Sequence, residues 1–224
     1  MFGDFTFTWN GAFAAEIFPV LLRAALITLQ ATVYGFAIAL VVGLVFALLR
    51  RGPKIVAWPA GFLVEFLRST PLLIQLYFLF YVLPQYGFGL PALMTGVIGL
   101  GLHYGAYLSE VYRTGIEGVD KGQWEAAIAL DFTMLHTWRT IVLPQAIPPM
   151  IPAFGNYFIV MFKETPLLSA ITVVELMQTA KIIGARTFSY VEPYTLVGLI
   201  FLLLSYPAAL VVNRLEARLA RPHR

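Results

Sequence analysis

The sequence predicts an all-α protein that crosses a membrane several times, and three observations lead to this prediction. Hydrophobic residues make up 59% of the 224 residues and charged residues only 12%, against about a quarter charged in soluble globular chains. The mean hydropathy is +0.79. Long windows without a charged residue alternate with short charged clusters, which is the pattern of helices that span a bilayer.

The charge-free windows predict the individual spans. Four windows lack Asp, Glu, Lys and Arg, and they cover residues 24–49, 69–109, 140–162 and 193–213. A helix that crosses a hydrocarbon core of about 30 Å needs about 20 residues. The second window is twice that length and contains a turn rich in Pro and Gly at residues 84–91, so it divides into two helices. We therefore expect a single domain of residues 1–224 with five transmembrane helices, at about residues 21–49, 69–86, 89–111, 142–163 and 193–213.

Two segments resemble neither a plain span nor a plain loop. Residues 55–67 contain Trp58, Pro59 and Glu65, and we expect an interfacial lead-in to the second helix. Residues 167–183 alternate apolar residues with Glu175 and Lys181. We expect there a short helix packed on the outer side of a pore, because irregular backbone at membrane depth must be buried in protein.

Lysine and arginine residues predict the orientation, because they gather in cytoplasmic loops. The net charge of +3 therefore reports on topology. The sequence lacks the basic residues interleaved with aromatic ones that would indicate a nucleic-acid-binding surface. Placing the N-terminus outside and the C-terminus in the cytoplasm puts most basic residues inside: Arg50, Arg51, Lys54, Arg68, Arg113, Lys121, Arg139, Arg214, Arg218, Arg221 and Arg224. The outer side then holds Arg23, Lys163, Lys181 and Arg186. The first ten residues lack the basic region of a cleaved signal peptide.

The polar loop at residues 114–144 is then cytoplasmic. Good helix formers at residues 122–130 predict one short helix, and Thr133 can cap a second helix at residues 134–141. The chain turns between them at Asp131. Ala126 and Ala127 allow a partner to approach closely, Glu125 offers a carboxylate, and Pro144 favours a bend into the next span.

Several motifs, in order, resemble the permeases of bacterial ABC importers, and specifically the polar amino-acid branch of histidine and glutamine type. They are Arg68-Ser69-Thr70-Pro71-Leu72-Leu73-Ile74-Gln75, the run from Tyr104 to Glu117, Gly122-Gln123-Trp124-Glu125-Ala126-Ala127, Leu143-Pro144-Gln145-Ala146, Lys163-Glu164-Thr165-Pro166-Leu167-Leu168-Ser169 and Glu175-Leu176. Three positions depart from the usual pattern: Asp131 stands where Gly is usual, Pro166 where a small hydroxyl residue is, and Glu164 where Asp is common. Asp tolerates left-handed backbone and can cap a helix, so the corner is expected to survive.

The resemblance implies a MetI-like permease in the bacterial cytoplasmic (inner) membrane. It also implies partners: two ABC ATPase subunits that carry ATP and Mg²⁺, a second permease subunit (the same chain or a sister chain), an extracytoplasmic solute-binding protein, and membrane lipid. The residues expected to couple the permease to the ATPase are Gly122, Glu125, Ala126, Ala127, Asp131, Leu143 and Pro144. The transported solute is expected to be a polar amino acid or a small zwitterion. Residues 62–84 and the segment Glu192-Pro193-Tyr194-Thr195-Leu196 are similar to permeases for ectoine-type compatible solutes.

Polar residues inside a membrane are costly and are therefore functional candidates. The candidates for the substrate path are Gln75, Tyr81, His103, Asn156, Lys163 and Glu164. Each has a structural alternative, because hydrogen bonds between helices stabilise a bundle by about 0.6 kcal/mol per pair. Lys163 and Glu164 can instead pair with the carboxylate and the amine of a substrate. Glu110 is expected to pair with Arg113 on its own helix.

Other classes of function fit the sequence less well. With no cysteine and histidine only at His103, His136 and His223, we expect no metal site, and an intramembrane protease lacks its constellation of residues. An ion-coupled secondary transporter or channel is the alternative, but the centres of the spans lack Asp and Glu. The chain also has no Gly-x-x-x-x-Gly-Lys phosphate loop, so we expect no catalytic residues or cofactors on it, with ATP hydrolysis on a partner subunit.

Overall fold

The computed structural model describes residues 9–219, and all regular elements in that range are helical. The α-helices are α1 (Gly11–Leu49), α2 (Lys54–Ser69), α3 (Leu72–Tyr77), α4 (Ala92–Glu117), α5 (Lys121–Ala129), α6 (Met134–Thr137), α7 (Leu143–Glu164), α8 (Leu176–Thr187) and α9 (Val191–Leu219). Two π-helical turns (Phe78–Val82 and Trp138–Val142) and two 3₁₀ turns (Leu83–Tyr86 and Thr165–Ile171) extend them. The all-α prediction is confirmed for these residues, whereas Arg221, His223 and Arg224 lie outside the described range.

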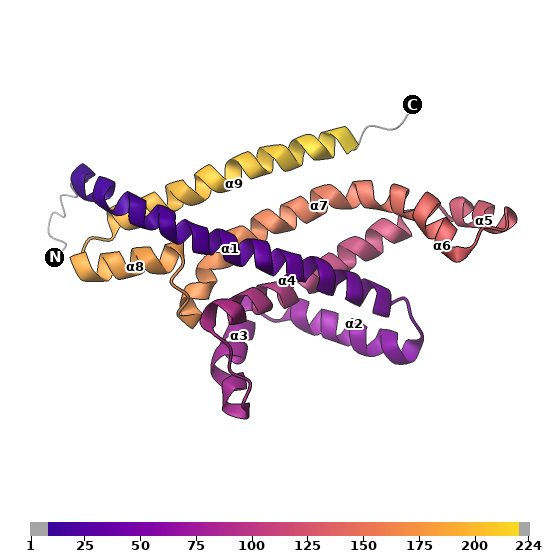
Figure 1. Cartoon of the computed structure of the whole chain (residues 1–224), viewed down its shortest axis with the longest axis horizontal. Coiled ribbons are helices and arrows are strands. Elements are labelled where there is room, and N and C mark those ends of the chain that lie inside the picture. Colours follow the sequence, from indigo (N-terminus) through magenta and orange to yellow (C-terminus); the bar gives the residue numbers. More distant parts are fainter. Residues whose placement is uncertain (1–8, 220–224) are drawn as a thin grey trace, which may run out of the picture.

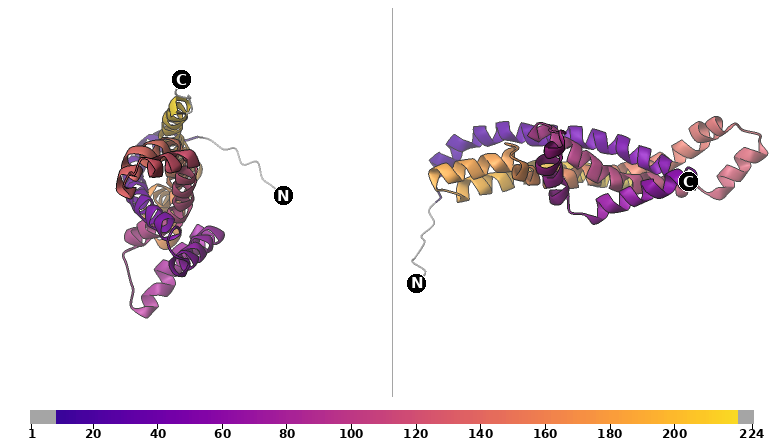
Figure 2. Two further views of the ribbon diagram at one scale, coloured as in Figure 1. Left: turned by 90° about the vertical axis from the view of Figure 1, so that its right-hand side faces the viewer. Right: turned by 90° about the horizontal axis from the view of Figure 1, so that it is seen from below.

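Four long helices, α1, α4, α7 and α9, run roughly along the long axis of the molecule (Figure 1). Helix α8 lies at the end where α1 and α9 begin, and α5 and α6 lie at the opposite end (Figures 1 and 2). Helix α1 has 39 residues, which corresponds to about 58 Å at 1.5 Å per residue. It begins ten residues before the predicted boundary at 21 and therefore extends beyond a hydrocarbon core of about 30 Å.

Helices α1 and α4 make the closest packing in the bundle, and small residues allow it. A Cβ atom on Gly43 of α1 would lie 2.9 Å from Leu108 Cβ and 3.0 Å from the carbonyl oxygen of Gly105 on α4. On the α4 side, a Cβ atom on Gly101 would lie 2.4 Å from Ile38 Cγ2. Glycine thus brings the two backbones together, which is how van der Waals contact holds helices in a bilayer that offers no hydrophobic driving force between them.

The span predicted at residues 69–86 is present as a helical segment, Leu72–Tyr86, made of α3 and the π-helical and 3₁₀ turns that follow it, and a sharp bend precedes it. Helix α2 ends at Ser69, and the segments 54–69 and 72–86 meet at an angle of 106°. The cause is Pro71, whose ring pushes the preceding residue into extended backbone: Thr70 has φ −107° and ψ 139°. The segment at 55–67, expected as an interfacial lead-in, is the helix α2, and α3 leaves the bundle sideways (Figure 1).

The other predicted spans agree with α4, α7 and α9 to within about six residues at each boundary. By length and hydropathy, α1 and α9 each suffice to cross a membrane, and two bent helix pairs raise the number to four. The number of five therefore remains a prediction. The expected short helix at residues 167–183 is present as α8, but it begins only after Glu175, whose carboxylate accepts hydrogen bonds from Met177 N and Gln178 N.

Candidate functional site

The loop between α4 and α7 folds as two short helices with a corner, as the sequence predicts. Asp120 caps α5 by accepting a hydrogen bond from Gly122 N at 2.6 Å, and Thr133 Oγ1 caps α6 by accepting from His136 N at 3.3 Å. Asp131 adopts left-handed backbone with φ 54°. Phe132 N donates to the carbonyl of Ala127 at 3.0 Å and closes the corner. The corner therefore survives the replacement of glycine by aspartate.

A few specific side-chain contacts attach the loop to the end of the bundle. The rings of Trp124 and Trp138 meet edge to face with centroids 5.5 Å apart, and the Arg51 guanidinium lies 5.9 Å from the Trp138 ring. Gln145 Nε2 donates to Gln123 Oε1 at 3.1 Å, which ties α7 to α5. These contacts cover an apolar cluster formed by Ile116, Val119, Val142, Ala146 and Met150. A displacement of the loop must therefore be transmitted to α4 and α7.

The tip of the loop exposes apolar side chains. Ile128 is 77% exposed and Met134 69%, and Glu125 and Ala126 are exposed beside them. An apolar patch on a loop outside the predicted spans indicates a protein-binding surface. Ala127 does not belong to that surface, because it is 1% exposed and packs inside the loop. The expectation that Ala127 lies on the surface that a partner touches is therefore wrong.

The remaining coupling candidates lie at the two ends of the loop. Gly122 is exposed in the first turn of α5, where a Cβ atom would lie 2.9 Å from the capping Asp120 Oδ1. Leu143 and Pro144 begin α7 and are exposed. The bend expected at Pro144 is absent, because residues 134–171 form one continuous helical run. Just before Pro144, which has no backbone N–H to donate, the π-helical turn Trp138–Val142 shifts the backbone hydrogen bonds by one residue.

A polar pocket of about 410 Å³ lies where the break after α2 meets α4 and the end of α7. Arg68, Thr70, His103, Tyr107 and Glu164 line it. Aromatic residues contact the lining of this pocket. The Tyr104 hydroxyl donates a hydrogen bond to Glu164 Oε2 at 2.7 Å, and the ring centroids of His103 and Tyr107 lie 5.2 Å apart. The residues that line the pocket thus include an arginine, a glutamate and two aromatic residues.

The substrate-path candidates divide into those at this pocket and those away from it. His103 and Glu164 line it. Gln75 Nε2 is already satisfied by the Leu67 carbonyl at 2.8 Å and Thr70 Oγ1 at 2.7 Å, and its Oε1 lies 3.2 Å from His103 Nδ1. Gln75 therefore braces the break after α2.

Three candidates lie apart from the polar pocket. Tyr81, in the π-helical turn after α3, donates to the carbonyl of Ala170 at 3.1 Å and does not line the pocket. Asn156 and Lys163 are exposed on α7 and do not line the pocket. The structure therefore brings together His103 and Glu164 of the predicted set and leaves these three elsewhere.

Arg68 and Tyr107 are functional candidates that the sequence analysis did not select. The sequence places Arg68 on a cytoplasmic flank. In the structure it lies near the end of α2, contacts Glu110 in the same charge network as Arg50 and Arg113, and also lines the pocket with Glu164. The signal in the sequence was the proline three residues after Arg68, because a helix that ends before a proline leaves its last side chains at the break.

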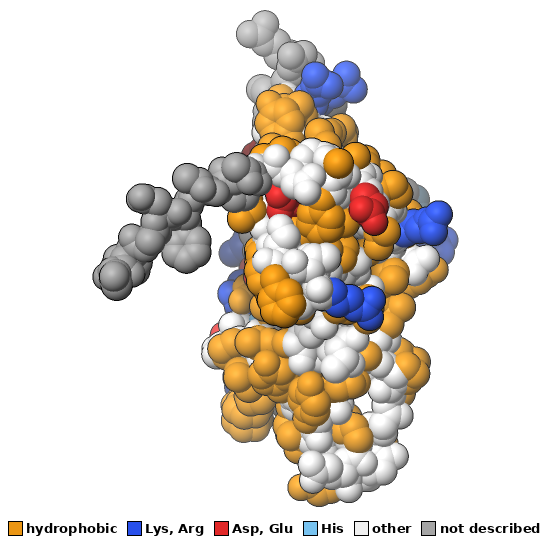
Figure 3. Space-filling model, turned by 90° about the vertical axis from the view of Figure 1, so that its left-hand side faces the viewer, with side chains coloured by type: hydrophobic (Ala, Val, Ile, Leu, Met, Phe, Trp, Pro, Cys, Tyr) orange, Lys and Arg blue, Asp and Glu red, His pale blue; other side chains and the backbone are white. Residues whose placement is uncertain are grey.

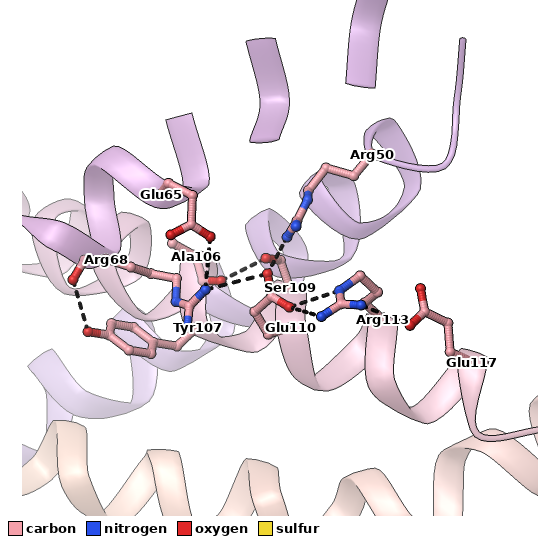
Figure 4. A network of polar contacts seen from close by, with 9 residues as sticks. All are labelled: Arg50, Glu65, Arg68, Ala106, Tyr107, Ser109, Glu110, Arg113 and Glu117. Carbon is pink, nitrogen blue, oxygen red and sulfur yellow. Dashed lines mark hydrogen bonds and ion pairs between the residues drawn. The ribbon is translucent and has the colours of Figure 1, made fainter. Parts of the chain in front are cut away.

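Arg68 also belongs to a charge network between α1, α2 and α4 (Figure 4). Glu110 Oε2 accepts from Arg113 Nε at 2.8 Å and from Arg113 Nη2 at 2.7 Å, which confirms the pair predicted from spacing. Glu110 Oε1 accepts from Arg50 and lies 3.5 Å from Arg68 Nη1. Hydrogen bonds from its guanidinium to Glu110 raise the pKa of Arg113 above its ordinary value, so Arg113 stays charged.

A second cavity of about 580 Å³ begins at this network and runs between α4 and α7 toward the loop. Glu110 and Tyr157 line it at one end, and Gly118 and Gln145 line it near the loop. The rings of Tyr107 and Tyr157, 5.8 Å apart, stand between the two cavities, because Tyr107 lines the first and Tyr157 the second. The molecule therefore contains two neighbouring cavities, which we call chambers, and the Tyr107–Tyr157 ring pair and the contact of Arg68 with Glu110 lie where their lining residues meet.

A helical bundle with long apolar helices, polar chambers and a rigid loop outside the spans defines the membrane subunit of a transport system. Residues 39–221 match the family model described as "Binding-protein-dependent transport system inner membrane component", and the chain belongs to this family. It is 50% identical over 221 residues to a probable amino-acid ABC transporter permease of Sinorhizobium fredii, covering 96% of each chain. It is 34% identical over 212 residues to an L-cystine transport system permease of Bacillus subtilis, covering 92% of this chain and 91% of the relative.

Solved structures agree with this assignment. The crystal structure of an amino acid ABC transporter with histidines superposes with a TM-score of 0.88 at 34% identity, covering 95% of this chain and all of the other. The permease of the MetNI methionine transporter shares the fold, with a TM-score of 0.72 at 19% identity over 92% of this chain and 99% of the other. The chain is thus a multi-pass permease subunit of an ABC transporter in the inner membrane. It is not an enzyme, and ATP hydrolysis resides on a separate subunit.

Proposed function

We propose that this chain forms the translocation pathway of an ABC importer for a polar amino acid, and that the polar pocket holds the amino acid during transport. The observation that carries this proposal is the placement of Arg68 and Glu164 on one cavity of about 410 Å³. An amino acid is a zwitterion, so it needs a cation for its carboxylate and an anion for its ammonium group. Guanidinium binds carboxylate with two parallel hydrogen bonds, a geometry that lysine cannot provide.

The relatives support the class of substrate. The names of similar permeases include L-cystine, arginine and glutamine transport, whose common part is the α-amino acid group. We assign that group to Arg68 and Glu164, with the side chain of the substrate toward His103 and Tyr107. An ectoine-like zwitterion also carries a carboxylate and a delocalised cation, so it remains a substrate that the same two charges would accept.

The proposed topology has five spans within residues 1–224, the N-terminus outside and the loop 114–144 in the cytoplasm. The basic residues of the α4–α7 loop and of the end of α9 support this orientation. Figure 3 looks onto the opposite end, at α8, where charged side chains of both signs stand among hydrophobic ones. In the proposed assembly a solute-binding protein docks at this outer end, and a second permease subunit covers the exposed faces of α2 and α3.

The proposed coupling runs through the tip of the loop. An ATPase subunit with ATP and Mg²⁺ would bind the exposed surface of Glu125, Ala126, Ile128 and Met134. Because the loop is packed onto α4 and α7 through Trp124 and Trp138, movement of the ATPase shifts the walls of the second cavity. ATP must bind one global state preferentially for this movement to drive transport.

The experiment that tests the pocket is substrate binding to the purified permease–ATPase complex in lipid nanodiscs. Glu164→Gln and Arg68→Gln each remove one charge from the pocket, and each should weaken binding of the transported amino acid at least tenfold, since hydrogen bonds to charged groups contribute about 1.5–3 kcal/mol. Arg214→Gln is the matched control, because Arg214 is exposed near the end of α9. Unchanged affinity in both pocket variants would contradict the proposed site.

A further inference from the structure

We propose that Glu110 is a positioning residue that competes with the substrate for Arg68 and thereby promotes release of the substrate toward the cytoplasmic chamber. This inference rests on the proposed function, in which Arg68 binds the substrate carboxylate. Glu110 then acts as an intramolecular counter-ion that contacts the same guanidinium when the substrate is absent.

Arg68 stands at the boundary between the two chambers. Arg68 lines the polar pocket, and its partner Glu110 lines the second cavity. The guanidinium lies 5.5 Å from the ring of Tyr107, whose hydroxyl donates to the Arg68 carbonyl at 3.3 Å. Tyr107 and the contact of Arg68 with Glu110 therefore lie together where the lining residues of the two chambers meet (Figure 4).

Arg68 is also the most loosely held arginine of the network. Arg113 makes two hydrogen bonds to Glu110 of 2.7 and 2.8 Å and one to Glu117 of 2.8 Å, and Arg50 bonds Glu110 directly. Arg68, by contrast, is 3.5 Å from Glu110 and 3.1 Å from Glu65, whose side chain is 61% exposed. Its Nε is buried and has no hydrogen-bond partner among the described residues.

The balance of charges explains why Arg68 can leave Glu110 for a substrate carboxylate at a small cost in free energy. Arg50, Arg68 and Arg113 face Glu65, Glu110 and Glu117, so the network has equal numbers of both signs. When Arg68 turns to a substrate carboxylate, Glu110 keeps Arg50 and Arg113 and is not left as an unpaired charge. The loss is one long contact to Glu110 and one exposed pair to Glu65, and exposed pairs contribute little. When those contacts form again, the carboxylate loses its partner.

The competition predicts that removing the competitor tightens binding. In the purified permease–ATPase complex in nanodiscs, without receptor and nucleotide, Glu110→Gln should lower the Kd about fivefold, the factor that corresponds to about 1 kcal/mol for a partly exposed ion pair. The probe is the L-amino acid that the wild-type complex binds most tightly among the twenty standard ones and L-cystine. Glu65→Gln should lower the Kd by a smaller factor of about two, because Glu65 is more exposed. In uptake assays, Glu110→Gln should lower both KM and kcat, because slower release limits turnover.

Glu117→Gln is the matched control. Glu117 belongs to the same network but bonds only Arg113, so its replacement should leave the Kd unchanged. If Glu110 only braced the helices, its replacement would lower the yield of folded complex and leave the Kd unchanged or higher. Glu65→Gln keeps the test decisive if Glu110→Gln does not fold, because Glu65 touches neither Arg50 nor Arg113.

The carboxamide of the same amino acid separates this inference from the proposed function. The wild-type complex should bind the carboxamide more weakly than the acid, and Glu110→Gln should leave the Kd for the carboxamide unchanged. If the wild-type complex binds both equally, Arg68 does not bind the carboxylate, and the proposed site and the competition both fail. If the wild-type complex prefers the acid but neither Glu110→Gln nor Glu65→Gln lowers its Kd, only the competition is refuted.

Discussion

Replacement of Gly43 by alanine tests the packing of α1 against α4 on which both chambers depend. The added Cβ would lie 2.9 Å from Leu108 Cβ, 3.0 Å from the Gly105 carbonyl oxygen and 3.1 Å from Ser109 N. Comfortable contacts between heavy atoms are about 3.5–4.0 Å, so α4 must move away by about 0.5–1 Å. Two of these atoms belong to the α4 backbone, which no change of rotamer can move. Overpacking of this kind costs about 1–3 kcal/mol.

The assay is thermal unfolding of the purified permease–ATPase complex, followed by size-exclusion chromatography with fluorescence detection. A loss of about 1–3 kcal/mol corresponds to a fall in Tm of several degrees, at about 2–4 °C per kcal/mol for a chain of this size. Gly198→Ala is the matched control, because nothing lies within 4 Å of a Cβ at Gly198 in α9. Alanine is favoured over glycine in helices by about 1 kcal/mol, so this variant should be as stable as wild type or more stable. Equal Tm values for the two variants would refute the close-packing argument.

Three further substitutions test other parts of the structure. Asp131→Val should lower coupled transport severalfold and Asp131→Gly should not, because the backbone at φ 54° costs about 1–2 kcal/mol for a residue without a capping side chain; uptake by both variants at equal expression checks this. Trp138→Ala should raise ATP turnover per molecule transported, because it removes the contacts with Trp124 and Arg51 that hold the loop to the bundle; normal stoichiometry would argue against a rigid connection. Glu175→Ala should lower Tm by several degrees, since it uncaps α8 and leaves buried N–H groups of Met177 and Gln178 without acceptors, at about 1–3 kcal/mol; an unchanged Tm would show that the cap is dispensable.

Local structure in this chain follows from local chemistry and was predictable. Charge-free windows located α1, α4, α7 and α9, because a span must be apolar over about 20 residues. The corner of the coupling loop followed from Asp131, which tolerates left-handed backbone, and from Thr133, which caps the next helix. These features depend on residues that are neighbours in the chain.

Features that depend on direction in space were not predictable in the same way. The proline at position 71 was visible, but neither the 106° angle between residues 54–69 and 72–86 nor the packing of both segments against α4 was. Counting basic residues beside apolar windows placed Arg68 on a cytoplasmic flank, but the count could not show that Arg68 shares a pocket with Glu164, because those residues lie 96 positions apart in the chain. The burial of Ala127 was also not predictable, because the nine-residue helix that carries it has no clear apolar face of its own.

The central claim is that an ATPase subunit binds the tip of the loop between α5 and α6, and cross-linking tests it most directly. The chain has no cysteine, so Ala126→Cys, at an exposed position, supplies its single thiol. In membranes that contain the whole transporter, a short thiol-to-amine cross-linker should join Ala126→Cys to the ATPase in at least one nucleotide state, whereas Ala185→Cys, exposed on α8 at the other end, should give no such product. Ile128→Cys, at a second exposed position, repeats the test. Absence of the cross-linked product for both Ala126→Cys and Ile128→Cys in every nucleotide state would contradict binding of the ATPase to this loop.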